Sequence, residues 1–127
     1  MAWKLDNDRP IYIQILEELE RRIIVGIYPS GDKMPSVREL AAQASVNPNT
    51  MQRAMSELET KGLVTTMRTS GRTVTNDSLM IAKKREELAN RQIRSFLDTM
   101  KQYGFQREEI MNLINSCLKG DEYESHY

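Results

Sequence analysis

The sequence of 127 residues predicts a mainly α-helical fold with one small β-ribbon. Three observations predict it. Apolar residues recur at helical spacing between residues 12 and 23, two short segments begin with helix-capping residues, and β-branched residues flank a turn near residue 70. A chain of this length has room for one compact domain of about 75 residues and a smaller appendage.

The first predicted helix starts at Pro10, which suits a first helical position, and stops at Gly26. Its apolar residues share one face, and we expect its charged residues on the opposite, solvent-exposed face. The apolar positions are Tyr12, Ile15, Leu16, Leu19 and Ile23, and the charged positions are Glu17, Glu18, Glu20, Arg21 and Arg22.

Two shorter helices follow, joined by a turn at Ser45-Val46. The segment from Ser36 to Glu39 has the pattern of a capping box and predicts a helix from about Val37 to Ala44. Asn47 as N-cap and Pro48 at the first helical position predict a third helix that continues to about Lys61. Its apolar set is Met51, Ala54, Met55 and Leu58. Two capped helices joined by so short a turn form a helix-turn-helix.

The β-ribbon follows the third helix. Leu63–Met67 and Arg72–Thr75 are rich in β-branched residues and flank Thr69-Ser70-Gly71, so they predict a two-stranded hairpin. A hairpin in this position is the wing of a winged helix-turn-helix. Residues 1–76 are therefore the predicted winged helix-turn-helix domain, a unit that places one helix in the major groove of DNA.

Residues 77–127 predict a C-terminal segment of two helices, from near Asn76–Ser78 to about Tyr103 and from about Arg107 to Leu118. A two-helix hairpin of about fifty residues buries too little surface to be stable alone. We therefore expect two copies to pack face to face through this segment and form a homodimer. The expected dimer contacts are the apolar residues Ile93, Phe96, Leu97, Met100, Ile110, Leu113 and Ile114.

Charge is balanced over the whole chain, with 18 basic and 18 acidic residues, but it is not evenly distributed. Leu40–Ser56 contains no acidic residue, and neither does Thr60–Asn76, which contains Lys61, Arg68 and Arg72. These are the two stretches that a winged helix presents to DNA. Because phosphates respond to the local field, a protein without net charge can still bind DNA.

With these residues in view, the chain resembles the GntR family of bacterial transcription regulators. The matching segments are Pro10-Ile-Tyr-Ile-Gln-Ile, Gly31-Asp-Lys-Met-Pro-Ser-Val-Arg-Glu-Leu-Ala, Val46-Asn-Pro-Asn-Thr-Met-Gln-Arg-Ala, Leu58-Glu-Thr-Lys-Gly-Leu and the wing tip at Gly71. About fifty residues follow, which resembles the short-tailed YtrA-like subfamily. Its members are typically dimeric repressors, often encoded beside ABC-transporter genes.

The resemblance implies DNA contacts at the start of the second helix, on the third helix and at the wing tip. These positions are Ser36, Arg38, Asn49, Thr50, Gln52, Arg53, Ser70, Gly71 and Arg72. For Arg38, a DNA contact also has support from its position. A positive charge in the first turn of a helix opposes the helix dipole, so Arg38 gains little stabilisation within the helix. The alternative for Arg38 is an ion pair with Glu39 or Glu57. Lys33 and Lys61 are interpreted as solvated lysines.

Other chemistry has little support. His126 lies in the polar C-terminal end, Cys117 is interpreted as a buried structural cysteine, and the sequence has no glycine-rich phosphate loop and no zinc-ligand spacing. We therefore expect no enzymatic activity, no cofactor and no metal. A single cysteine, no apolar run of about 20 residues and no signal-peptide pattern predict a cytoplasmic protein with no membrane partner.

The sequence thus predicts a dimeric repressor that binds a palindromic operator in double-stranded DNA, with a transporter operon as the regulated unit that the resemblance implies. The signal would be an unidentified small-molecule effector lodged between the C-terminal helices and the DNA-binding domain. The alternative hypothesis is a winged-helix protein-interaction module whose partner binds the surface of residues 93–118, with DNA binding secondary.

Overall fold

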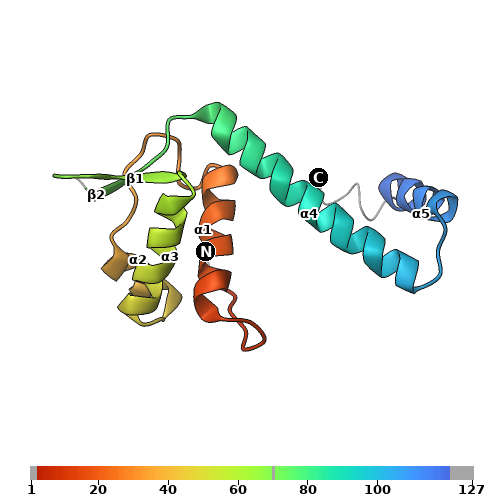
Figure 1. Ribbon diagram of the computed structural model, residues 1–127, viewed down its shortest axis with the longest axis horizontal. Coiled ribbons are helices and arrows are strands. Elements are labelled where there is room, and N and C mark those ends of the chain that lie inside the picture. Colours follow the sequence, from red (N-terminus) through yellow and green to blue (C-terminus); the bar gives the residue numbers. More distant parts are fainter. Residues whose placement is uncertain (1–2, 70, 121–127) are drawn as a thin grey trace. The chain divides into compact units, whose positions relative to one another are not determined.

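The computed structural model describes residues 3–69 and 71–120. Within them, five helices and one antiparallel ribbon confirm the predicted fold class (Figure 1). The elements are α1 (Ile11–Ile24), α2 (Val37–Ala44), α3 (Pro48–Thr60), β1 (Val64–Met67), β2 (Gly71–Val74), α4 (Ser78–Gln102) and α5 (Arg107–Lys119). The chain forms two compact units, one ending at Arg85 and the other beginning at Glu86.

The core of the first unit is built around α3, which packs against α1, α2 and β1. The apolar stripes predicted for the first and third helices are those that become buried, because each supplies one apolar face at helical spacing. The residues with no exposed surface are Ile15, Leu19, Leu40, Met51, Ala54 and Leu58. This packing holds α2 and α3 together as a rigid pair.

The interpretation of α1 was wrong for two charged residues. Glu20 and Arg22 were expected on the solvent-exposed face, but only 2% of Glu20 and 3% of Arg22 is exposed. Lys61 Nζ lies 2.9 Å from Glu20 Oε1, and Lys84 Nζ lies 3.7 Å from Glu20 Oε2. The helical pattern of α1 could not reveal this burial, because both lysines come from later elements of the chain.

Arg22 is buried by aromatic residues on either side of α1 in the sequence. Its guanidinium lies 4.1 Å from the centre of the Trp3 ring, donates to the Tyr28 hydroxyl at 3.0 Å and donates to Glu18 Oε2 at 2.7 Å. Buried arginine is tolerated when it is paired and hydrogen-bonded, as Nε and Nη1 of Arg22 are, although its buried Nη2 has no hydrogen-bond partner among the described residues. These contacts attach the segment before α1 and the loop after it to the helix.

The ribbon pairs Val64 with Val74 and Met67 with Gly71. The loop before α2 joins this ribbon, because Lys33 forms a bridge with Thr73 and the Met34 amide donates to the Arg72 carbonyl at 2.8 Å. The wing and the start of α2 are therefore fixed to each other. That connection places two parts of the predicted DNA-binding surface side by side.

The first unit extends past residue 76, the domain boundary predicted from the sequence, and ends at Arg85. Met80 and Ile81 pack against the core, and Lys84 pairs with the buried Glu20. Met80 also lies close to Gly62, where the φ is +82° and an added Cβ would lie 3.2 Å from the Met80 side chain. The first two turns of α4 therefore belong to the first unit.

The second unit has much less internal packing. Among its described residues α4 buries none, and α5 buries only Ile110, which is 4% exposed. Cys117, interpreted as buried, is exposed, because among residues 3–69 and 71–120 no element covers this part of α5. Among the described residues, no helix is both long and apolar enough to cross a membrane.

The hydrogen bonds of the Glu18 carboxylate predict how the free energy of unfolding depends on pH. Hydrogen bonds from Arg21, and then from Arg22, hold the pKa of this carboxyl below its ordinary value of 4.5. A carboxyl with a lowered pKa contributes stability above its unfolded-state pKa and loses it as pH falls through the folded-state pKa. We expect the free energy of unfolding, measured by urea titration, to fall below pH 4.5 and to fall less in Glu18→Gln.

The matched control is Glu57→Gln, since no side-chain hydrogen bond or ion pair of Glu57 occurs in the described part of the chain. This variant should follow the wild-type pH dependence. An equal pH dependence in Glu18→Gln and wild type would contradict the assignment.

Candidate nucleic-acid interface

The start of α2 is fixed by the predicted capping box. Ser36 Oγ accepts from the Glu39 amide at 3.1 Å, and the Ser36 amide donates to Glu39 Oε1 at 3.4 Å. Glu39 is therefore turned back toward the cap instead of pairing with Arg38. Arg38 is exposed, and within residues 3–69 and 71–120 no carboxylate pairs with it. Its guanidinium donors remain available to a ligand at the surface.

The third helix has the cap that its sequence predicts, with Asn47 Oδ1 accepting from the Asn49 amide at 2.7 Å. Because Met51, Ala54, Met55 and Leu58 are buried, Asn49, Gln52 and Arg53 are exposed on the other side of the helix, and Thr50 is half-buried at its margin. Gln52 donates to the Ser56 hydroxyl at 3.1 Å. The outer surface of α3 is thus polar and carries amide, hydroxyl and guanidinium groups near its N-terminus.

The wing is attached to α3 through Glu59. Arg72 Nε lies 3.2 Å from Glu59 Oε1, and the Thr66 hydroxyl donates to the same oxygen. The Thr66 hydrogen bond, followed by that of Arg72, holds the pKa of the Glu59 carboxyl below its ordinary range. Gly71 begins β2 with a φ of +78°, which favours glycine. Ser70, also predicted to contact DNA, lies outside the described residues.

A hollow of about 400 Å³ lies between the start of α2 and the wing. Ser36, Gly71 and Arg72 line it, so the structure brings these predicted DNA-contact residues together. Lys33 lines the same hollow and is exposed, which agrees with its interpretation as a solvated lysine. No local pattern could place Lys33 there, because its position depends on the bridge to Thr73, forty residues away along the chain.

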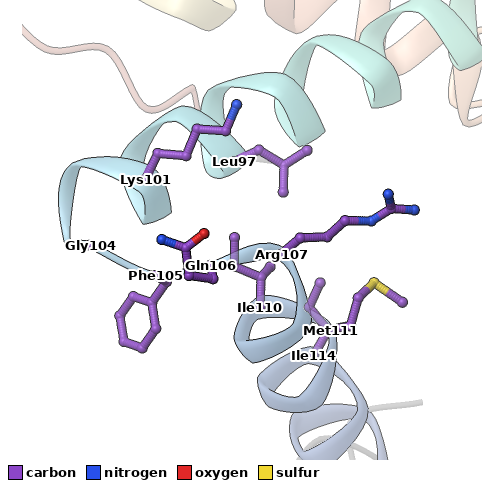
Figure 2. Close-up of a pocket in the computed structure, with 9 residues that line it drawn as sticks. All are labelled: Leu97, Lys101, Gly104, Phe105, Gln106, Arg107, Ile110, Met111 and Ile114. Atoms are coloured by element: carbon purple, nitrogen blue, oxygen red, sulfur yellow. The ribbon is translucent and has the colours of Figure 1, made fainter.

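The residues predicted for dimerisation lie in the second unit. Ile93, Phe96 and Leu113 are 53%, 42% and 43% exposed. Leu97, Met100 and Ile114 are half-buried, whereas Ile110 is already buried within one chain. Figure 2 shows a hollow where α4 turns into α5, with Leu97, Ile110 and Ile114 on its apolar wall and Lys101 and Arg107 also lining it. Its volume is about 620 Å³.

A capped helix pair with a polar outer surface, joined to a wing, defines a winged helix-turn-helix protein of the DNA-binding regulator class. Residues 11–74 match the family model described as "Bacterial regulatory proteins, gntR family". The chain belongs to the GntR family of transcription regulators. Membership of this family confirms the resemblance on which the DNA-contact residues were assigned.

Two similar proteins are those of Bacillus subtilis (strain 168). The chain is 34% identical to the "Uncharacterized HTH-type transcriptional regulator YhcF" over 117 residues, which are 92% of this chain and 97% of that protein. It is 45% identical to the "HTH-type transcriptional repressor YtrA" over 65 residues, which are 51% of this chain and 50% of that protein. The likeness to YhcF therefore includes the second unit.

Solved structures show the same relationship. A GntR family transcriptional regulator from Listeria monocytogenes has a TM-score of 0.83 at 36% identity, with 88% of this chain and 98% of that chain covered. The structure of AraR(DBD) in complex with operator ORE1 has a TM-score of 0.51 at 27% identity, with 59% of this chain and 94% of that chain covered. The latter is a DNA-binding domain bound to its operator.

Ser36 is the N-cap of α2 and a predicted DNA contact, and substitutions at this residue can separate the two roles. Ser36→Ala should lower the free energy of unfolding by about 0.5–2 kcal/mol, because the cap is lost. Ser36→Asp retains a good N-cap and should unfold close to wild type. Its carboxylate, however, would face phosphate and should weaken duplex binding tenfold or more, measured by fluorescence anisotropy. Wild-type DNA affinity in Ser36→Asp would mean that Ser36 does not face the DNA backbone.

Proposed function

We propose that this regulator is a homodimeric repressor that binds a palindromic operator, with the second unit as its dimer contact. The single observation that carries the proposal is the lack of internal packing in that unit. Its described residues form two helices with an apolar stripe, yet only Ile110 is buried. A segment of this size cannot be stable with its apolar face in water. A second copy, which carries the same stripe, covers it.

Several features support DNA as the ligand of the first unit. Arg38 is exposed without a partner in the described part of the chain, and the outer surface of α3 presents Asn49, Gln52 and Arg53. An arginine can donate two hydrogen bonds to guanine, and Asn or Gln can do the same to adenine. In a helix-turn-helix, the N-terminal part of the recognition helix reaches base edges. Ser36, Gly71 and Arg72 serve as contacts to the phosphate backbone.

Repression is the regulatory outcome proposed, and it is supported by the name of the similar repressor YtrA. Two recognition helices related by a two-fold axis read half-sites about one helical turn apart, which is why the operator is palindromic. The dimer occludes the polymerase at that operator in the cytoplasm. A transporter operon is the regulated unit, and a small-molecule effector provides the signal for release.

The first test is a binding selection from a random duplex library with the full chain at near-physiological salt. We expect enrichment of a two-fold symmetric motif, and we expect Arg38→Ala to lose about 1–3 kcal/mol of discrimination for that motif while its unfolding curve is unchanged. Failure of the folded wild-type protein to enrich any motif would contradict the proposal and favour the protein-interaction hypothesis.

The second test concerns the dimer. Leu113→Glu places a charge on the exposed apolar stripe of α5, so we expect a monomer by light scattering at micromolar concentration and a loss of operator affinity of about 100-fold or more. Asn112→Glu adds the same charge at an exposed polar position on the same helix and should remain a dimer. A dimeric Leu113→Glu variant, or a monomeric wild type, would refute this contact.

A further inference from the structure

Arg53 is the one predicted DNA-contact residue whose charged group is stacked on an aromatic ring in the described residues. Its guanidinium carbon lies 3.6 Å from the centre of the Tyr12 ring. Tyr12 is half-buried in the first turn of α1, whereas Arg53 is exposed on α3. The contact therefore joins the outer surface of α3 to α1, a helix predicted from the sequence only as a core element.

Stacking leaves the arginine able to bind DNA. A guanidinium that stacks on a ring meets it through its face, and this leaves the N–H donors, which lie in the plane of the group, free to bind another partner. In the part of the chain that the structure describes, no side chain or carbonyl accepts a hydrogen bond from Arg53. Gln52 and Arg72, by contrast, are engaged with Ser56 and Glu59. Tyr12 thus orients Arg53 without occupying its donors.

The direction of the contact indicates which part of DNA Arg53 meets. Arg53 leaves α3 on the same exposed face as Asn49 and Ser56, but its guanidinium lies over the Tyr12 ring and is therefore drawn to the α1 side of that face, at its margin. When a helix lies in the major groove, its middle faces the base edges and its margins face the phosphates on either side. An arginine held at the margin is suited to a phosphate oxygen.

We propose that Tyr12 is a positioning residue for DNA binding, whose ring holds the Arg53 guanidinium at the margin of the recognition helix for a contact with backbone phosphate. This inference rests on the proposed function. Its physical basis is entropy, because a free arginine on a helix surface must give up many rotamers to make one contact, whereas a stacked one is already restricted. Phosphate carries no sequence information, so Tyr12 affects affinity without affecting specificity.

The test compares Tyr12→Leu with Tyr12→Phe. Leucine keeps an apolar side chain but removes the ring, whereas phenylalanine keeps the ring and removes only the hydroxyl. Binding is measured by anisotropy with the duplex that wild type selects and with a scrambled duplex of equal length. We expect Tyr12→Leu to weaken binding to both duplexes by about two- to fivefold for each protomer, and Tyr12→Phe to bind as wild type.

Arg53→Ala provides a readout that a purely structural role of Tyr12 would not affect. Loss of a phosphate contact should lower the slope of log affinity against log salt by about 0.9 for each protomer. In the Arg53→Ala background, Tyr12→Leu should cause no further loss. Arg53→Lys keeps the charge but loses the planar group that stacks, so its affinity should fall between wild type and Arg53→Ala.

Several results would overturn the inference. These are additive effects of the two substitutions, a loss confined to the selected duplex, equal loss in Tyr12→Phe and Tyr12→Leu, or wild-type binding by Tyr12→Leu. If Tyr12→Leu does not fold, Tyr12→Met replaces it, because methionine is also apolar and favours helix. A wild-type protein that binds no duplex would instead contradict the proposed function, so the two failures are distinguishable.

Discussion

The burial of one face of α3 is the constraint on which the rest of the structure depends. Met51, Ala54 and Leu58 have no exposed surface, and α1, α2 and β1 all pack against this helix. A helix with one face fixed in a core must present the opposite face to solvent. This packing therefore exposes Asn49, Gln52 and Arg53. It also fixes the position of α2 and the attachment of the wing.

The pairing of acidic side chains in the first unit explains how a chain without net charge can bind an anionic ligand. Glu39 is turned back to the Ser36 amide, and Glu59 accepts from Thr66 and Arg72. These two acidic groups beside the interface are thus used in hydrogen bonds that shape it. Arg38 has no acidic partner in the described residues. Local pairing, rather than net charge, decides which charges a ligand meets.

The two units differ in how they are stabilised. The first has a core to which all of its helices and strands contribute, and its boundary reaches into α4 through Met80 and Lys84. The second unit, among its described residues, buries Ile110 alone. Under the proposed dimer, the stability of the second unit depends on protein concentration, because association supplies the burial that one chain lacks.

The sequence by itself determined the elements of this protein and their faces. Caps at Ser36 and Asn47 and apolar residues at helical spacing are local signals, so the helix boundaries, the buried stripe of α3 and the exposed polar face opposite it could be predicted. Only the tertiary structure decided the pairs that join distant segments. These are Glu20 with Lys61 and Lys84, Lys33 with Thr73, Arg72 with Glu59, and Arg53 with Tyr12. The physical reason is that partners brought together by packing leave no periodic pattern in the sequence. A charged residue such as Glu20 has the same local sequence pattern whether it is solvated or buried with a counter-ion.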